Sequence, residues 1–420
     1  MVVKWIDWKK SFVIFLIYDT PTIKSRKIIR MSQKITAGID IGTYQVRVVV
    51  SSHEKAREFP KILGGGSAES KGLRHGYIIN SGDVVKSVQA AIAQAEKTSG
   101  QRIRRAYISV GGIGLSSTVA VGHSIVSRGD QIVTELDIDA ATTSAEEAIP
   151  QAVIQNRKII YTIPVQWKID GKPVLGRVLG MKGVKIEVKV LFITCLEPHL
   201  NDLLEAVEEA GIDVIDVVAS PIAASFVTLS KPQKMAGCVL ANIGAETLSI
   251  VVFENNIPIS LEVFPIGGSD ITNDIALGLK VALEEAEVIK IGGLTHSSYP
   301  QKRLEEIVGA RLSDMFELVE THLKKIGKNG LLPAGIIITG GGSYINSVED
   351  VARATLHLPS RVASLKVGEG KIQLKDSSWS VAYGLCIMGT IPEEEERLGL
   401  SRHGGEFFSK IFDWFKQFLP

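Results

Sequence analysis

The residues of this chain best suited to chemistry lie in two short glycine turns that are far apart in the sequence. Asp40 comes just before a turn of Gly42 and Thr43, and Asn242 comes just before a turn that contains Gly244. A glycine turn lets backbone N–H groups approach a phosphate closely, and a carboxylate at a strand end can hold a hydrated Mg²⁺ beside it. Two such turns facing each other across a cleft would clamp a nucleotide triphosphate from both sides.

Each turn joins two apolar, β-rich runs, and this pattern predicts a β-hairpin. The first hairpin comprises residues 37–43 and 46–50, and the second comprises residues 240–247 and 248–252. Many strand turns contain glycine, so one copy alone would indicate little. The duplication makes a nucleotide site the better interpretation.

A third glycine turn lies at residues 340–342, between an apolar run at 335–339 and a helical pattern that begins at Ile345. Three consecutive glycines allow a flat ring or a sugar to lie against bare backbone. A tight strand-to-helix connection would explain a lone triplet equally well. The position of this one after two phosphate-type hairpins favours the nucleotide site.

The composition indicates a protein of several domains with no nucleic-acid or zinc site. The chain has 420 residues, and its net charge of +1 provides no basic field for nucleic acid. Cys195, Cys238 and Cys386 have no zinc-type spacing and lie in apolar segments, so we expect buried thiols in a reducing cytoplasm. No apolar run reaches the ~18 residues that a membrane-spanning helix needs.

The amino terminus allows several interpretations. Residues 12–18 form a short apolar run after Lys9 and Lys10, as at the start of a signal peptide, but no small-residue cleavage site follows. Trp5 and Trp8 would also suit a segment lying on a membrane surface. Met31 precedes the first hairpin as a natural start would, so we expect residues 1–30 to be a non-essential extension.

The rest of the chain alternates helical and strand patterns, which indicates a two-lobed α/β protein. Apolar spacing predicts helices at residues 82–98, 137–148, 200–210, 271–291, 300–326 and 379–388. Strands are predicted at residues 104–110 and 186–194. The stretch from 111 to 165 interrupts the nucleotide-site elements, so we expect it to belong to an inserted lobe.

The last residues predict an amphipathic helix behind a polar tether. Glutamates follow Pro392, and the polar stretch ends at Gly404 and Gly405, which is typical of a flexible linker. One helical face of residues 406–420 then carries the large apolar side chains of Phe407, Phe408, Ile411, Phe412, Trp414, Phe415, Phe418 and Leu419. A core helix is the alternative, but the aromatic face and the tether favour a helix in a membrane interface.

These features together resemble the FtsA family of actin-like bacterial cell-division proteins, over nearly all of residues 35–420. Residues 38–43 (GIDIGT) resemble the first phosphate motif of the family, and residues 335–342 (GIIITGGG) resemble its adenosine motif. Signatures of the inserted 1C subdomain and the strand region after it resemble residues 107–112 (YISVGG) and 179–184 (LGMKGV). The segment entering subdomain IIB resembles residues 267–276 (GGSDITNDIA) and 285–290 (EAEVIK).

The resemblance implies an actin/Hsp70-type two-lobed fold with an inserted 1C subdomain of the SHS2 type and a C-terminal amphipathic helix. The implied division of the chain is subdomain IA at 31–81, 166–192 and 378–391, subdomain 1C at 82–165, subdomain IIA at 193–266 and 333–377, subdomain IIB at 267–332, a linker at 392–405 and the membrane helix at 406–420.

The implied function is that of an ATP- and Mg²⁺-binding protein that polymerises at the cytoplasmic face of the cell membrane, at the division site. Such a protein would tether the ring of the tubulin-like protein FtsZ by binding the FtsZ C-terminal tail. It would recruit later division proteins through subdomain 1C, and no nucleic acid would be bound.

The resemblance also implies roles for particular residues. The nucleotide-binding residues would be Asp40, Gly42, Thr43, Asn242, Gly244, Thr247, Glu287, Lys290, Gly340, Gly341 and Gly342, with the metal held by Asp40 through water. Glu287 and Lys290 would face the adenosine. The membrane would be contacted by Phe408, Ile411, Phe412, Trp414, Phe415 and Phe418. Lys302, Arg303 and Arg311 are the basic candidates for the FtsZ tail, and a solvated helix face is the alternative for each.

The chain departs from the family pattern in the phosphate motifs. Asn242 stands where the family usually has Asp, and Ala245 and Glu246 stand where it has a glycine-rich turn. Glu246 would bring a negative charge to the phosphates. Gln45 stands where the family often has Lys, which would remove a phosphate partner. We therefore expect ATP hydrolysis to be weak or absent.

A further departure is the short stretch between Lys290 and Arg303, which predicts that strands of subdomain IIB are missing.

Two other functions share this superfamily. A small-molecule kinase would need a carboxylate base where Asn242 stands, and it would have no use for an aromatic tail. A pilus-assembly actin homologue has the same fold and a 1C-type lobe, but we expect it to bind a partner peptide rather than insert its own tail. An Hsp70-type chaperone is disfavoured because no substrate domain follows residue 390.

Overall fold

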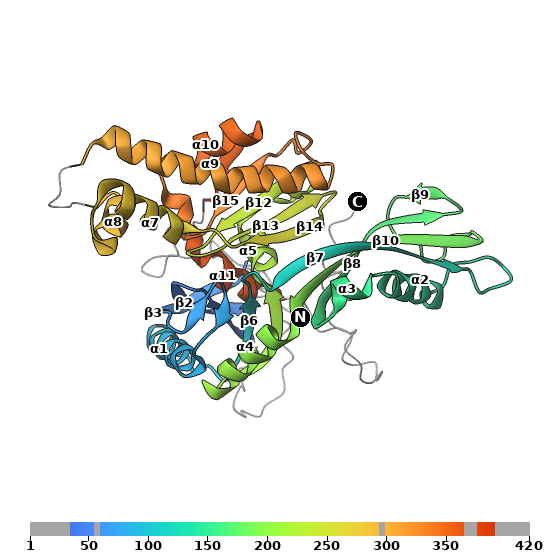
Figure 1. Ribbon diagram of the computed structural model, residues 1–420. Coiled ribbons are helices and arrows are strands. Elements are labelled where there is room, and N and C mark those ends of the chain that lie inside the picture. The colour runs from blue at the N-terminus through green and yellow to red at the C-terminus, as the bar shows by residue number, and fades with distance from the viewer. Residues whose placement is uncertain (1–33, 54–58, 294–298, 365–375, 391–420) are drawn as a thin grey trace, which may run out of the picture. The chain divides into compact units, whose positions relative to one another are not determined.

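The computed structural model describes residues 34–53, 59–293, 299–364 and 376–390 (Figure 1). The predicted extension at 1–30, the linker at 392–405 and the amphipathic helix at 406–420 lie outside the described residues. Among the residues described, no helix is long and apolar enough to cross a membrane.

The first lobe is built on a five-stranded sheet with the strand order β11-β6-β1-β2-β3. The bounds of its strands are Lys34–Ile41 for β1, Gln45–His53 for β2, Lys61–Glu69 for β3, Arg105–Val110 for β6 and Asp213–Ala219 for β11. Strands β1 and β2 are antiparallel, which confirms the first predicted hairpin, and β1 and β6 are parallel. A small hairpin of β4 (Leu73–Arg74) and β5 (Tyr77–Ile78) follows β3.

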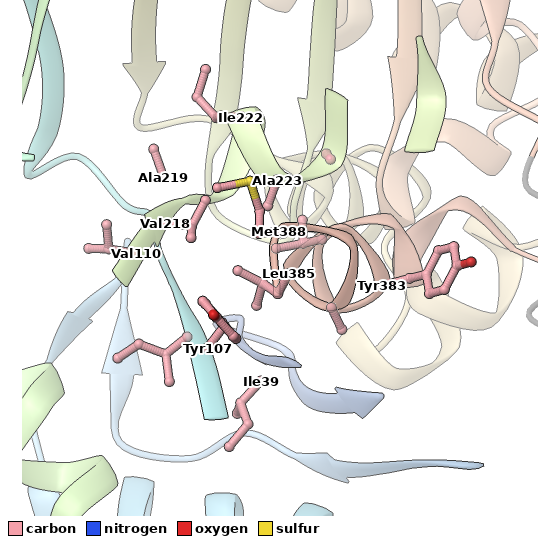
Figure 2. Close-up of a cluster of buried hydrophobic side chains, with 14 of the residues drawn as sticks. Ile39, Tyr107, Val110, Val218, Ala219, Ile222, Ala223, Tyr383, Leu385 and Met388 are labelled. Atoms are coloured by element: carbon pink, nitrogen blue, oxygen red, sulfur yellow. The ribbon is translucent and has the colours of Figure 1, made fainter. Parts of the chain in front are cut away.

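Helices cover both faces of this sheet, which explains why the centre of β2 is buried without alternation. Helix α1 (Ser81–Ser99) packs on β3, and it begins at the capping side chain of Asn80 and ends at Gly100. Helix α4 (Glu197–Glu209) lies beside α1. Helices α5 (Ser220–Thr228) and α11 (Ser380–Met388) pack against each other, and Figure 2 shows Leu385 of α11 among Ile39, Tyr107 and Ala223.

The second lobe repeats the topology of the first. Its five-stranded sheet has the order β14-β13-β12-β15-β16, so an antiparallel meander again continues into two parallel strands. The bounds are Cys238–Ile243 for β12, Leu248–Glu254 for β13, Ile257–Phe264 for β14, Ile336–Thr339 for β15 and Ser360–Val362 for β16. The second predicted hairpin is β12–β13 and is confirmed. The repeat places Gly42 and Gly244 in equivalent turns.

The helices of the second lobe are α6 (Lys231–Ala236), α7 (Gly268–Leu279), α8 (Leu283–Lys290), α9 (Gln301–Lys325) and α10 (Val348–Leu356). One helix was predicted at 271–291, and this prediction is wrong. Lys280 adopts the left-handed conformation with φ 57° and ends α7, so the chain turns and α8 packs back against α7. The described residues of 267–332 contain helices and no strand, in agreement with the expected loss of strands there.

A third sheet forms the inserted lobe, with the order β7-β10-β8-β9. The bounds are Leu115–Ile125 for β7, Arg157–Ile169 for β8, Lys172–Val174 for β9 and Lys185–Leu196 for β10. Helix α2 (Glu135–Glu147) packs on β7 so closely that a Cβ atom on Gly122 would lie 2.1 Å from the carbonyl oxygen of Ala141. The short helix α3 (Gln151–Ile154) precedes β8.

The strand pairing corrects the predicted extent of the inserted lobe, which was 82–165. Helix α1 and strand β6 belong to the first lobe because they pack on or pair with its sheet. Strands β8 to β10 belong to the insertion because they pair with one another and with β7, although 166–192 was assigned to the first lobe. Strand β11 also pairs with β6, so 213–219 belongs to the first lobe and not to the second.

Candidate functional site

One cavity of about 660 Å³ lies where the turns of the two repeated sheets meet. All the residues predicted to bind nucleotide line this cavity, namely Asp40, Gly42, Thr43, Asn242, Gly244, Thr247, Glu287, Lys290, Gly340, Gly341 and Gly342. They come from the end of β1 and the turn after it, the end of β12 and the turn after it, helix α8 and the turn after β15. The structure therefore brings together residues that were chosen from four separate segments.

The two phosphate-type turns have matching geometry. The N–H of Gly42 donates to the carbonyl of Gln45 at 3.2 Å, and the N–H of Gly244 donates to the carbonyl of Thr247 at 2.8 Å. A Cβ atom on either glycine would lie about 3 Å from that same carbonyl oxygen, at 3.0 and 3.1 Å. Glycine thus keeps both turns tight while their remaining backbone borders the cavity.

Asp40 lies on the floor of the cavity among polar side chains of the first sheet. Its carboxylate accepts a hydrogen bond of 2.7 Å from the Ser109 hydroxyl, which comes from the parallel strand β6. Burial raises the pKa of the Asp40 carboxyl above its ordinary value, and the Ser109 hydrogen bond and the Arg47 charge oppose that rise. A desolvated carboxylate that faces a cavity is a favourable partner for a cation.

Arg47 is a site residue that the sequence analysis missed. It lies directly opposite Asp40 in the β1–β2 register, so both side chains project from the same face of the sheet, and it lines the cavity. Its guanidinium lies 5.9 Å from the centre of the Trp379 ring. Gln45 also lines the cavity. Arg47 thus brings a cation to the cavity two positions after Gln45, where the family often has Lys, and the hairpin register could have indicated this.

Glu246 was predicted to bring its charge to the phosphates, but it does not line the cavity. Its carboxylate accepts a hydrogen bond from the backbone N–H of His75. The expected negative charge at the phosphates is thus turned away toward the β4–β5 hairpin. The sequence could not reveal this partner because the two residues are 171 positions apart.

The glycine triplet forms an open wall of the cavity. Gly340 has φ 88°, and a Cβ atom there would lie 2.3 Å from Oδ1 of Asn242 and 2.5 Å from the carbonyl oxygen of Ile243. A Cβ atom on Gly342 would lie 2.3 Å from the side chain of Ile243. A Cβ atom on Gly341, by contrast, would meet nothing within 4 Å. Only Gly341 leaves open space that a bound sugar or ring could fill.

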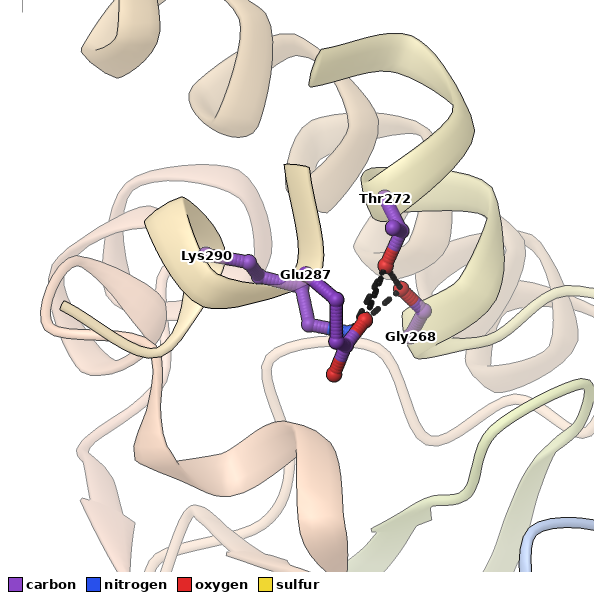
Figure 3. Close-up of polar contacts among 4 residues, drawn as sticks. All are labelled: Gly268, Thr272, Glu287 and Lys290. Atoms are coloured by element: carbon purple, nitrogen blue, oxygen red, sulfur yellow. Dashed lines mark hydrogen bonds and ion pairs between the residues drawn. The ribbon is translucent and has the colours of Figure 1, made fainter. Parts of the chain in front are cut away.

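Lys290 and Glu287 form a closed polar cluster with the start of α7 (Figure 3). The Lys290 ammonium donates to Oε2 of Glu287 at 2.6 Å, to the Thr272 hydroxyl at 2.8 Å and to the Gly268 carbonyl at 3.1 Å. An ammonium has three N–H donors, and all three have acceptors here. Oε1 of Glu287 accepts no hydrogen bond from the described residues. Lys290 therefore orients Glu287 toward the cavity, and the break between α7 and α8 makes this contact possible.

The three basic candidates for the FtsZ tail differ in their surroundings on α9. Arg311 is held by Asp274 of α7, with an Nε–Oδ2 distance of 2.6 Å, and by Asp314 at 3.4 Å. Its guanidinium is thus used inside the protein, which disfavours a role in partner binding. Lys302 is exposed, and Arg303 makes an exposed ion pair of 3.4 Å with Glu306. Their role remains a prediction.

The predicted membrane residues on 406–420 lie outside the described residues. The three cysteines are buried and free, as expected.

The sequence is similar to curated cell-division proteins over most of its length. The cell division protein FtsA of Bacillus subtilis is 30% identical over 375 residues, which cover 84% of this chain and 83% of that protein. The chain belongs to the FtsA family. The FtsA of Pseudomonas aeruginosa is 28% identical over 400 residues, which cover 90% of this chain and 94% of that protein.

Two segments match family descriptions individually. Residues 239–384 match "Cell division protein FtsA", and residues 115–194 match "SHS2 domain inserted in FTSA". The second match coincides with strands β7 to β10, which supports the boundaries given by strand pairing over those predicted from the sequence. The predicted function in cell division is confirmed at the level of the family.

The solved structures similar to this FtsA-family chain show its fold. The "PilM-PilN type IV pilus biogenesis complex" has a TM-score of 0.63 at 18% identity, covering 85% of this chain and 99% of that chain. The ethanolamine utilization protein EutJ of Carboxydothermus hydrogenoformans has a TM-score of 0.51 at 15% identity, covering 85% of this chain and 90% of that chain. The two-lobed actin-like fold with an SHS2-type insertion is confirmed. The pilus protein shares the fold, whereas the FtsA proteins also share the sequence.

Proposed function

We propose that this chain binds ATP with Mg²⁺ in the cavity between its lobes and acts as a polymerising membrane tether in cell division. The observation that carries the proposal is the convergence of both phosphate-type turns, the glycine triplet and the Glu287–Lys290 cluster on one cavity. The carboxylate suits the metal, the basic side chain suits the phosphates and the open glycine wall suits the adenosine.

The phosphates would lie between the turns at Gly42 and Gly244. Backbone N–H groups of these turns and the Thr43 hydroxyl would contact them, and the Arg47 guanidinium would supply the positive charge. The adenosine would lie along Gly341, where the backbone leaves open space. Glu287 is held in place by Lys290, and its Oε1, which has no hydrogen bond from the described residues, would accept one from a ribose hydroxyl.

The residues present fit a hydrated Mg²⁺. Asp40 and Asn242 offer oxygen atoms to the cavity, and oxygen is the ligand type that Mg²⁺ prefers. The described residues contain no cluster of three or more His, Cys, Asp or Glu side chains that could hold a metal alone. Asp40 would therefore hold the ion through water while the phosphates complete its shell. When bound, the ion would neutralise phosphate charge.

A binding experiment distinguishes the role of Arg47 from that of Gln45. We expect Arg47→Ala to weaken ATP binding roughly ten- to a hundredfold, because a charge-assisted contact contributes about 1.5–3 kcal/mol. Gln45→Ala, which alters a neighbouring neutral side chain, should change the affinity less than about threefold. Isothermal titration calorimetry with ATP and Mg²⁺ measures both. The assignment is wrong if Gln45→Ala causes the larger loss.

Hydrolysis of ATP should be very slow or absent. The carboxylates that line the cavity are Asp40, Glu284, Glu287 and Asp376, and position 242 next to the second turn carries a neutral amide. Asp40 would be taken up by the hydrated metal ion, and Glu246 is turned to His75, so among the described residues neither phosphate-type turn offers a free carboxylate as a general base. Phosphate release should stay far below the ~10 per second of a typical enzyme. Rapid turnover that Asp40→Ala abolishes would contradict this account of the site.

The remaining parts of the proposal follow from family membership. The chain would polymerise at the cytoplasmic membrane face, where the amphipathic segment predicted at 406–420 would attach it. It would bind the FtsZ C-terminal tail through subdomain IIB, with Lys302 and Arg303 as the better-placed basic residues. The SHS2-type lobe would recruit later division proteins.

A further inference from the structure

Glu246 and His75 make a two-point contact between the two lobes, next to residues that line the cavity. The backbone N–H of His75 donates to Oε2 of Glu246 at 2.5 Å. The Nδ1 atom of His75 lies 3.1 Å from the backbone carbonyl of Glu246, and because a carbonyl only accepts, Nδ1 carries the proton. Two hydrogen bonds thus join a loop of the first lobe to the phosphate-type turn of the second.

The first-lobe side of this contact is a strained hairpin turn. His75 and Gly76 connect β4 to β5 with φ values of 49° and 87°, so both residues are left-handed, as in a type I′ turn. Histidine tolerates this conformation better than most side chains do. The N–H of the first turn residue points away from such a hairpin, and Glu246 provides its acceptor.

The second-lobe side is fixed to the start of helix α7. The carbonyl of Gly244 accepts from the N–H of Gly268 at 2.9 Å, and the carbonyl of Ala245 accepts from the N–H of Ser269 at 2.7 Å. A Cβ atom on Gly267 would lie 2.4 Å from the carbonyl oxygen of Ala245, so the backbones touch there. Glu246 therefore extends from a turn that is hydrogen-bonded to the start of α7.

The hairpin also touches the chain that enters the inserted lobe. The carbonyl of His75 accepts from the N–H of Ile113 at 3.2 Å. A Cβ atom on Gly76 would lie 2.4 Å from Cα of Gly112, and the carbonyl of Gly112 accepts from the N–H of Leu115, where β7 begins. A continuous series of backbone contacts thus runs from α7 through Glu246 and His75 to β7.

We propose that the Glu246–His75 pair is an interlobe latch that holds the cavity closed and links its occupant to the inserted lobe. Gly244 and Thr247 flank Glu246 and line the cavity, so a ligand that shifts this turn also shifts the hairpin. The hairpin in turn positions residues 112–115 at the base of β7. The link to nucleotide rests on the proposed function, whereas the latch itself exists in the protein without ligand.

The latch is tested first in the full chain without nucleotide, by residue-resolved hydrogen–deuterium exchange at the His75 amide. Glu246→Ala should speed this exchange about tenfold, because the amide loses a charged acceptor. Glu246→Gln retains an acceptor oxygen, so it should speed the exchange of the His75 amide less than Glu246→Ala does. Glu147→Ala, which removes an exposed glutamate from α2, should leave the exchange unchanged. Equal exchange in wild type and Glu246→Ala would overturn the latch.

The same measurement with ATP and Mg²⁺ tests the link to the inserted lobe. ATP should slow exchange in residues 111–118 of the wild type and should do so less in Glu246→Ala. An equal response in both proteins would overturn the link. If ATP does not bind the wild type, the proposed function fails while the ligand-free arm still decides the latch. If Glu246→Ala does not fold, His75→Asn takes its place. This variant keeps the backbone N–H and tolerates the left-handed turn, and it should loosen the latch.

Discussion

Gly341→Val is expected to reduce the affinity for ATP roughly ten- to a hundredfold and to leave the fold intact. A Cβ atom at this position meets no atom within 4 Å, and the residue lines the cavity, so the added side chain takes space that the adenosine needs. Overfilling a packed space by this much typically costs about 1–3 kcal/mol or more. Calorimetry gives the affinity, and thermal unfolding shows whether the fold is intact.

The matched control is Gly309→Val on helix α9. A Cβ atom on Gly309 also meets nothing within 4 Å, but this residue does not line the cavity. The Gly309→Val variant should bind ATP with the affinity of the wild type. Gly341→Val with wild-type affinity would show that the adenosine does not lie along the glycine triplet.

Phe412→Glu combined with Trp414→Glu is expected to release the full chain from lipid vesicles. The charges of the segment cancel, Lys410 and Lys416 against Glu406 and Asp413, so apolar insertion must provide the affinity. Each buried large side chain contributes roughly 1.5–3 kcal/mol, and less where burial is partial. Replacing two of these side chains by glutamate should leave most of the protein in the supernatant after sedimentation with vesicles. The Trp414 emission of the wild type should shift to the blue when vesicles are added.

Gln417→Glu is the control, since it adds a glutamate to the face of this segment that the sequence predicts to be polar. It should sediment with vesicles as the wild type does. Equal sedimentation of the wild type and the double variant would contradict the anchor, provided that Trp5 and Trp8 are not a second contact. The assay on a chain that begins at Met31 removes that alternative.

The repeated sheets could be predicted because their signals are local. Each hairpin is an apolar run, a glycine turn and another apolar run, and such a pattern fixes the pairing of neighbouring strands. Most helices were found for the same reason. The break at Lys280 was missed because the apolar pattern continues through it, and only the left-handed backbone of Lys280 and the packing of α8 against α7 reveal it.

Most residues of the site could be identified from the sequence, but the contacts between them could not. The glycines and Asp40 carry a local signature, whereas the position of Arg47 depends on the hairpin register, and the partner of Glu246 comes from another lobe. The borders of the inserted lobe were placed wrongly because the sequence does not show which strands pair. Strand β10 is as apolar as a strand of the main sheets, and only its partners β7 and β8 assign it.

Every role assigned to the site residues depends on ATP binding in the cavity between the lobes, and a calorimetric titration of the wild type with ATP and Mg²⁺ measures this binding. We expect a heat of binding that fits one site per chain and a higher unfolding temperature in the presence of ATP. Gly341→Val should weaken both effects and Gly309→Val should retain them. A wild-type protein that shows neither heat nor a thermal shift would rule out ATP binding at this site.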